Sequence, residues 1–308
     1  MKDLLIKLAW ALLLITAPFS CSYEDFRVDY PYSTVYFANQ VIKRSFVEDE
    51  NNTIKVGVML GGKRLNSVDE WVRFTVEDPA GLEETSYSLL PDQYYTLSSN
   101  NEMIIHSGTF MGEISMEIDP SFFTDSLAYK NHYALIFKLE DTSTDSILYM
   151  KDSLLLVIGF ESRYFGNYYH NGRTIRKDTT DGSIIDTVFY HQEEPVTNNI
   201  NIWPLITGGS KTLYSKGIAY YAPSDLTGFI IGVEDDFSLQ ISEDPGLSSI
   251  GYDWKLKQSD GENLYDPEKK IFILNYEFID LIKGYHCYAT DTLKFRNRIL
   301  DGVNQWDF

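Results

Sequence analysis

The sequence predicts an all-β protein of two domains, and three observations indicate this class. Short runs in which apolar and polar residues alternate recur along nearly the whole chain, with Gly, Asn, Asp or Pro between them. Helical periodicity is weak everywhere except in the segment 120–129. The 308 residues suffice for two separate cores at roughly 100 to 200 residues each.

The first predicted domain spans residues 34–160. About seven short strands with turn residues between them fit an immunoglobulin-like β-sandwich. The expected strands are 35–37, 54–60, 72–76, 103–105, 114–118, 133–137 and 154–158.

The second predicted domain spans residues 161–308. Roughly eight or nine sequential strands with hairpin-length gaps fit either an up-and-down antiparallel barrel or a second sandwich, and we favour the barrel. Asp266 and Pro267 predict a hairpin turn, since proline presets the turn dihedral and aspartate can bond its own backbone. The β-type runs are 164–169, 184–190, 200–203, 212–214, 218–220, 229–233, 238–241, 252–256, 271–276 and 285–288.

The composition indicates a folded, acidic protein. Hydrophobic residues make up 44% of the chain and aromatic residues 15%, which argues against disorder. The formal net charge is -19, and such a surface repels the phosphates of nucleic acids. Nucleic acid is therefore not an expected partner.

The amino terminus has the layout of a bacterial lipoprotein signal peptide. Basic residues precede an apolar run at 8–17, which is too short to span a bilayer, and a small residue, Ser20, stands directly before Cys21. We expect cleavage after residue 20, lipidation of Cys21 and a tether over 21–33. Simple secretion with Cys21 as an ordinary thiol is the alternative, because Pro18 stands where the cleavage motif usually has leucine.

The segment after Cys21 suggests where the protein is exported. Its acidic residues, Glu24 and Asp25, resemble the export signal that sends Bacteroides-type lipoproteins to the exterior face of the outer membrane. Removal of residues 1–20 deletes Lys2, Lys7 and Asp3, a net charge of +1, and changes the formal charge from -19 to -20. We therefore expect a soluble body on a lipid anchor, without electrostatic adhesion to lipid.

Several segments together resemble a family of two-domain Bacteroidota surface lipoproteins. The resemblance covers nearly the whole mature chain, and it implies an immunoglobulin-like N-terminal domain of unknown function and a lipocalin-like C-terminal domain. It also implies, as partners, an outer-membrane TonB-dependent transporter and its lid lipoprotein, while some members are described as adhesion proteins. The resemblance rests on Val35-Tyr36-Phe37-Ala38-Asn39-Gln40, Met59-Leu60-Gly61-Gly62, Tyr265-Asp266-Pro267 with Phe272-Ile273-Leu274-Asn275-Tyr276, and the segment from Ala289 to Arg298.

Sequence signatures of catalysis and of cofactor binding are lacking. The nucleophile-elbow, zincin, Cys-x-x-Cys and dinucleotide motifs are missing, and the five histidines are scattered without zinc-ligand spacing. The acidic segments 234–236 and 260–263 lack the spacing of a known calcium loop. Cys287 alternates with aromatic residues and is expected to be a buried hydrophobe. We expect no cofactor, no metal and no catalytic residue, although an unrecognised glycosidase carboxylate pair stays open.

Strand parity selects candidate ligand contacts among the aromatic residues. Two isoleucines, at 200 and 202, share one face of their strand, which leaves Trp203 with Asn199 and Asn201 on the other. A ring beside amide groups suits a polyol ligand. The alternative is that this face is the barrel interior or the domain interface. The same test puts Trp71 with the polar residues of its strand and makes it a further candidate, whereas Trp254 is expected in the core. Weaker candidates are the tyrosines Tyr168, Tyr169, Tyr220 and Tyr221.

Six tripeptides resemble the O-glycosylation motif of Bacteroides-type surface proteins. Each has Asp, then Ser or Thr, then one of a small set of mostly apolar residues, and about one or two would arise by chance. The alternative is that strands often begin with such triplets. The acceptor residues are Ser126, Ser146, Ser153, Thr179, Thr187 and Thr292.

These inferences favour a non-enzymatic lipoprotein of the outer-membrane surface. We expect it to bind a glycan, or another oligomeric nutrient such as peptide, as an accessory to a TonB-dependent importer. The alternatives are an adhesion or structural surface protein and, third, an unrecognised glycoside hydrolase.

Overall fold

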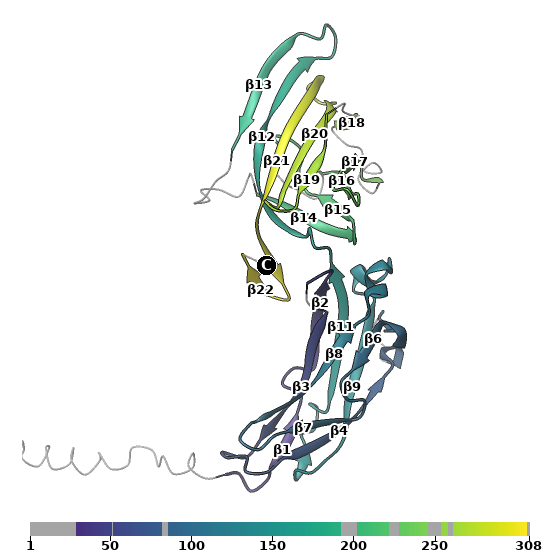
Figure 1. Cartoon of the computed structure of the whole chain (residues 1–308), viewed down its shortest axis with the longest axis vertical. Helices are drawn as coiled ribbons and strands as arrows, with labels where there is room; N and C mark the ends of the chain where they lie inside the picture. The colour runs from purple at the N-terminus through teal and green to yellow at the C-terminus, as the bar shows by residue number, and fades with distance from the viewer. Residues whose placement is uncertain are drawn as a thin grey trace, which may run out of the picture.

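The computed structural model describes residues 29–50, 52–81, 86–191, 202–221, 228–245, 254–257 and 261–306. The chain is all-β, with an N-terminal sandwich and a C-terminal domain in line along one long axis (Figure 1). The fold class predicted from the sequence is confirmed.

Two facing sheets form the sandwich. The first sheet has the order β10-β1-β3-β8-β6 and the second β2-β11-β9-β4-β7, with β5 paired to β9. Most pairs are antiparallel, while β1 with β10, β2 with β11 and β5 with β9 are parallel. The strands are β1 (Thr34–Tyr36), β2 (Val41–Val47), β3 (Thr53–Gly61), β4 (Glu70–Glu77), β5 (Ser88–Leu89), β6 (Tyr95–Leu97), β7 (Glu102–Ile105), β8 (Met111–Ile118), β9 (Tyr133–Thr142), β10 (Ser146–Ile147) and β11 (Ser153–Glu161).

Alternation along these strands builds the sandwich core. In β4, Val72 and Phe74 point inward while Arg73 and Thr75 face solvent, as the period of two requires. The segment expected to be the one helical stretch forms two short 3₁₀ helices, η5 (Pro120–Thr124) and η6 (Ala128–Lys130). The Asp119 side chain accepts a hydrogen bond from the Ser121 amide and caps η5. Two further 3₁₀ helices are η3 (Pro79–Gly81) and η4 (Asp92–Tyr94).

One large antiparallel sheet forms the C-terminal domain and curls into a nearly closed barrel. Its order is β17-β16-β15-β14-β12-β21-β20-β18, with β13, β19 and β22 paired to β12, β20 and β21. Backbone hydrogen bonds from Leu239 to Asn263 (3.0 Å) and from Tyr265 to Phe237 (2.9 Å) join the β16–β17 hairpin to β19 and close part of the circuit. The strands are β12 (Gly166–Asp178), β13 (Ile184–Tyr190), β14 (Ile202–Gly209), β15 (Thr212–Ser215), β16 (Ile230–Val233), β17 (Leu239–Ser242), β18 (Trp254–Lys257), β19 (Leu264–Asp266), β20 (Ile271–Asp280), β21 (Tyr285–Leu300) and β22 (Val303–Gln305).

The predicted turn between β19 and β20 is present. Asp266 Oδ1 accepts hydrogen bonds from the backbone amides of Glu268 (3.1 Å) and Lys269 (3.0 Å). The run 218–220 is not a strand, since Ile218 and Tyr221 form an isolated bridge across a tight turn.

The end of the chain connects the two domains. Strand β21 continues past the barrel toward the sandwich and turns back as β22 (Figure 1). Arg298 on β21 is buried, and its guanidinium pairs with Glu50 of the sandwich. Asp301 in the turn accepts a hydrogen bond from the Ser45 amide of β2 at 3.0 Å. The hairpin therefore bonds directly to the sandwich.

Candidate functional site

Asp291 is the centre of a buried polar cluster inside the C-terminal domain. The inward row of β21 contains Cys287, Ala289, Asp291 and Leu293, so alternation alone places this carboxylate in the interior. The Tyr276 hydroxyl donates to Asp291 Oδ2 at 2.5 Å, and the Tyr190 hydroxyl donates to Oδ1.

His170 completes this cluster from β12. Its Nε2 atom lies 3.3 Å from Asp291 Oδ1, and both side chains are fully buried. Burial, reinforced by the nearby Asp291 charge, raises the pKa of the Tyr190 and Tyr276 hydroxyls, so both remain proton donors to the carboxylate. The cluster is closed to solvent. Because a buried carboxylate must be hydrogen-bonded, these contacts stabilise the domain.

Trp203 lies in this interior and has 0% of its surface exposed. Its ring stacks on the His170 ring, with centroids 3.8 Å apart and an interplanar angle of 25°. The prediction that Trp203 is a surface platform for a ligand is therefore wrong. Ile202 and Trp203 do lie on opposite faces of β14, but the Trp203 face is the barrel interior, where Leu205 also points.

The end of the barrel far from the sandwich carries a second cluster, which we call the tyrosine cluster: Tyr220, Tyr221, Tyr285 and Arg176. The Tyr220 and Tyr221 rings stack with centroids 4.7 Å apart at 30°. The Arg176 guanidinium carbon lies 5.3 Å from the ring centroids of both Tyr220 and Tyr285. Arg176 lies two residues before the end of β12 and Tyr285 begins β21, at the tip opposite the sandwich (Figure 1).

Two carboxylates hold the tyrosine cluster in place. Asp186 on β13 binds the Arg176 guanidinium through two nitrogens, with Nε 2.6 Å from Oδ1. Asp280 accepts hydrogen bonds from the hydroxyls of Tyr221 (2.5 Å) and Tyr220 (3.4 Å). The hydrogen bond from Arg176 lowers the pKa of Asp186, while burial raises the pKa of Tyr220 to about 12. Both tyrosines are therefore neutral at physiological pH.

Half-buried rings with fixed polar neighbours suit recognition of a polyol. The rings of Tyr220, Tyr221 and Tyr285 are partly open to solvent. Flat aromatic faces stack on sugar rings, and a guanidinium with carboxylates supplies donors and acceptors for hydroxyl groups. Arg176, Asp186, Asp280 and Tyr285 were not singled out from the sequence. The inward parity of Arg176 on a long strand was the available signal, but it required the full length of β12.

The predicted ligand residue Trp71 does not come together with Trp203. Trp71 lies on the outer face of β4 in the sandwich, where the Arg73 guanidinium covers its ring at 4.6 Å. The predicted outward parity of Trp71 is thus confirmed, but it belongs to a different domain. Cys21, Asn199 and Asn201 lie outside the described residues. Trp254 is buried as expected, and so is Cys287, whose thiol pKa burial raises to about 11.

The six predicted glycosylation residues differ in accessibility. Ser126, Ser146, Thr179 and Thr187 are exposed, whereas Ser153 and Thr292 are half-buried. Thr292 lies within β21 between β12 and β20, and its Oγ1 donates to the Asn171 carbonyl at 3.3 Å. Because the preceding Asp291 lies in the core, the folded protein does not present this tripeptide for glycosylation, and the prediction for Thr292 is wrong.

Among the described residues, no group of three or more His, Cys, Asp and Glu side chains is arranged to hold a metal ion. None of the helices in those same residues has the length and apolar character needed to cross a bilayer.

Comparisons with known proteins support the two-domain architecture. Residues 30–146 match a family model whose description reads "-like, N-terminal domain". A solved Bacteroides ovatus protein of unknown function is 15% identical and superposes with a TM-score of 0.62, over 90% of this chain and 96% of that chain. The chain shares the fold of that protein. The resemblance predicted from the sequence is therefore found at the level of the fold, in a Bacteroides ovatus protein of unknown function.

A further solved structure is less similar. A multidomain Bacteroides ovatus protein that includes DUF1735 is 12% identical and covers 88% of this chain and 97% of that chain, with a TM-score of 0.43. No curated protein matches the chain.

Proposed function

We propose that this protein is a non-enzymatic lipoprotein of the outer-membrane surface that binds a glycan, or another oligomeric nutrient such as peptide, for a TonB-dependent importer. The observation that carries the proposal is the position of the tyrosine cluster. The described chain begins at Asp29, at the end of the sandwich opposite the C-terminal domain (Figure 1). A lipid on Cys21 would therefore leave the tyrosine cluster at the end of the molecule remote from the anchor.

The architecture supports presentation of a ligand. The sandwich acts as a spacer, and the β21–β22 hairpin joins it to the barrel through Arg298 and Asp301. The proposed partners are the outer membrane, through the anchor, and the transporter with its lid lipoprotein. The transporter and its lid lipoprotein would receive a ligand held at the tyrosine cluster.

Binding of glycans and peptides by purified variants tests the proposal. We expect the wild-type chain to bind at least one oligosaccharide or peptide in an array, and Tyr220→Ala to weaken binding about tenfold, which corresponds to about 1.4 kcal/mol. Tyr221→Phe keeps the ring and removes the hydrogen bond to Asp280, so it should weaken binding less. Tyr149→Ala, an exposed tyrosine of the sandwich, is the matched control. Equal binding by the Tyr220→Ala and Tyr149→Ala variants would contradict the assignment.

Purification of the native complex tests the partner. The protein is extracted from outer membranes in mild detergent with a tag after Phe308, and co-purifying proteins are identified. Recovery of a TonB-dependent transporter supports the importer function. Recovery of the protein alone, together with an array that shows no ligand, favours adhesion.

The adhesion alternative has its own structural support. Strand β13 and the β20–β21 turn expose large apolar side chains on this domain, with Ile184, Leu281 and Ile282 near the same tip and Phe189 at the other end of β13. Apolar side chains grouped on a surface are typical of protein contacts. Loss of cell attachment by Phe189→Ser with Ile282→Ser, and retention by Tyr220→Ala, would favour this alternative.

A further inference from the structure

The loop end of the sandwich, opposite the C-terminal domain, exposes an unusual set of large side chains. They belong to three segments, 30–32, 65–68 and 149–150, and each is more than half exposed. We call this set the loop-end patch: Tyr30 (76% exposed), Tyr32 (72%), Leu65 (70%), Val68 (54%), Tyr149 (86%) and Met150 (74%).

Hydrogen bonds join the three segments side by side. The Tyr30 amide donates to the Gly62 carbonyl at 2.9 Å, which places the start of the chain beside the loop that carries Leu65. Asp145 accepts from the Ser33 amide (2.8 Å) and hydroxyl (2.6 Å), and the Leu148 amide donates to the Val35 carbonyl at 2.9 Å. The segments 65–68 and 149–150 therefore both flank the start of the described chain at 30–37.

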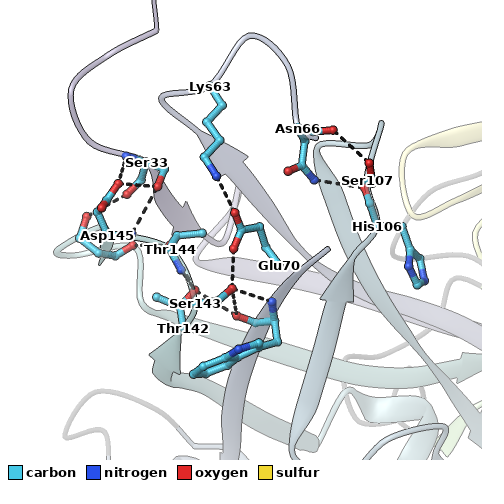
Figure 2. Close-up of polar contacts among 12 residues, drawn as sticks. Ser33, Lys63, Asn66, Glu70, His106, Ser107, Thr142, Ser143, Thr144 and Asp145 are labelled. Atoms are coloured by element: carbon cyan, nitrogen blue, oxygen red, sulfur yellow. Dashed lines mark hydrogen bonds and ion pairs between the residues drawn. The ribbon is translucent and has the colours of Figure 1, made fainter. Parts of the chain in front are cut away.

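A polar network fixes these loops from beneath (Figure 2). Glu70 pairs with Lys63 at 2.5 Å and accepts from the Ser143 hydroxyl at 2.5 Å. The Asn66 amide group donates to the carbonyls of His106 and Thr109, both at 3.1 Å. The exposed side chains are consequently presented on loops that this network holds in place.

The residues exposed in the turn at 148–151 contribute little to the stability of the fold. Met150 has a backbone φ of 63°, a left-handed conformation that favours glycine or asparagine. Methionine is tolerated in this conformation at a cost in stability. In addition, 74% of Met150 is exposed to water. The adjacent Tyr149 is also exposed, so this pair makes little contact that would stabilise the fold.

We propose that the loop-end patch rests on the lipid surface into which the acyl chains of Cys21 insert. This inference relies on the lipid anchor in the proposed function. Asp29, where the described chain begins, lies beside the patch, since its carboxylate accepts from the Arg64 amide at 2.6 Å. Seven residues lie between Cys21 and Asp29 in the sequence, and the eight Cα–Cα steps can span at most about 28 Å. An acylated Cys21 therefore confines this end of the sandwich to the neighbourhood of the bilayer.

The chemistry of the patch suits the interface of a membrane. Tyrosine rings concentrate at the headgroup level, and leucine, valine and methionine side chains insert among the upper acyl groups. The carboxylates at this end are bonded within the protein: Asp145 to Ser33, Asp69 to Ser107 and Glu70 to Lys63. The attraction in this contact therefore comes from the apolar and tyrosine side chains. The acidic charge of the whole chain predicted no electrostatic adhesion, and this mode of contact requires none.

Fluorescent labels on the acylated protein test the contact directly. Leu65→Cys carries an environment-sensitive nitrobenzoxadiazole label, and Phe189→Cys, similarly exposed on β13 of the C-terminal domain, is the matched control. Cys287 is buried and should not react. In vesicles of phosphatidylethanolamine and phosphatidylglycerol, we expect a blue shift for the Leu65 label and none for the Phe189 label. Equal emission from the two labels in an acylated protein would overturn the inference and leave the anchor intact.

A second measurement separates the patch from the anchor. A Cys21→Ser chain lacks the acyl groups, and its residual flotation with the same vesicles reports the patch alone. We expect Leu65→Ser with Val68→Ser and Met150→Asn to reduce that flotation about tenfold, or about 1.4 kcal/mol, while Phe189→Ser with Ile282→Ser does not. Thermal unfolding confirms that each variant is folded.

The outcomes distinguish the two proposals. Flotation of the Cys21→Ser chain, combined with a native mass that lacks acyl groups, would retain the patch and reject the anchor. Loss of transporter co-purification by the loop-end variant, with no vesicle binding by any non-acylated chain, would show that the patch docks on a protein and would reject the lipid contact.

Discussion

The interiors of the two domains are built differently. The sandwich core consists of apolar side chains such as Val72, Phe74 and Phe137, and its buried polar residues lie at the two ends, including Asn66 and Glu70 in the loop-end network. The C-terminal domain instead buries His170, Thr174, Asp280 and Asp291. Two sheets packed face to face can fill their core with apolar side chains alone. The single curled sheet encloses space that polar side chains fill here.

This difference separates two sources of stability. Apolar packing is non-directional and tolerates many sequences, while a buried carboxylate is stable only with its particular donors. The sandwich is therefore suited to a spacer. The barrel has a specified interior beneath the tyrosine cluster. Three experiments examine whether the domains respond as differently as their cores suggest.

The largest effect should come from the sandwich core. Phe137→Ala removes a fully buried ring from the central strand β9, where it packs against Phe74 at a centroid distance of 5.7 Å. We expect a loss of about 4 kcal/mol in the unfolding free energy of the sandwich. Hydrogen exchange measured by mass spectrometry resolves the two domains peptide by peptide. Phe189→Ala, an exposed ring, is the control and should change stability by less than about 0.5 kcal/mol.

An equal increase of hydrogen exchange in β9 and β21 on Phe137→Ala would contradict the expected difference between the domains. That result would mean that the two domains unfold as one cooperative unit.

A smaller effect should come from the buried carboxylate. Asp291→Ala leaves the hydroxyls of Tyr190 and Tyr276 without their acceptor, and we expect a loss of about 3 kcal/mol confined to the C-terminal domain. Asp291→Asn preserves the shape and one acceptor oxygen, so it should lose less, about 1 to 2 kcal/mol. Urea unfolding followed by hydrogen exchange measures both. If Ala and Asn cost the same, the cluster contributes by volume and not by hydrogen bonding.

The smallest effect concerns pH at the junction. Glu161 ends β11, and its carboxylate accepts a hydrogen bond from Thr207 of the barrel. Burial raises the pKa of Glu161 above its ordinary value of 4.5, so the folded chain keeps this proton to a higher pH than the unfolded chain. Its stabilising contribution is complete below pH 4.5 and is lost as the pH rises through the folded value.

Glu161→Gln should remove this dependence. We expect the Tm of the variant minus the Tm of the wild type to increase from about pH 4 to about pH 8, since other groups titrate equally in both chains. Calorimetry at a series of pH values measures this difference. A difference that decreases with pH would mean that Glu161 is stabilised as a carboxylate.

Alternation and turn residues predicted the class and most of the strands. All seven strands expected in the sandwich occur, within β1, β3, β4, β7, β8, β9 and β11. These strands each have one buried face, which writes a period of two into the sequence. Strand β2 was missed because its first half, at Val41–Arg44, is open to solvent and lacks that contrast.

The long strands of the barrel were underestimated. The predicted runs 164–169 and 285–288 are pieces of β12 and β21, which extend over Gly166–Asp178 and Tyr285–Leu300. Polar residues occupy inward positions along both strands, so the hydrophobic pattern stops where the polar cluster begins. The same inward polar residues explain why Asp291 and Arg176 were not identified as parts of sites.

The sequence by itself determined the all-β class, the two-domain order and the apolar sandwich core, because strand periodicity and turn chemistry are local properties. Parity along β14 also separated Trp203 from its isoleucine neighbour Ile202. Only the tertiary structure decided which face was inside, and it placed Trp203 against His170 and grouped Tyr220, Tyr221, Tyr285 and Arg176 at one tip. Periodicity fixes which residues share a face, but the side of a curled sheet that becomes its interior depends on pairings between strands far apart in the chain.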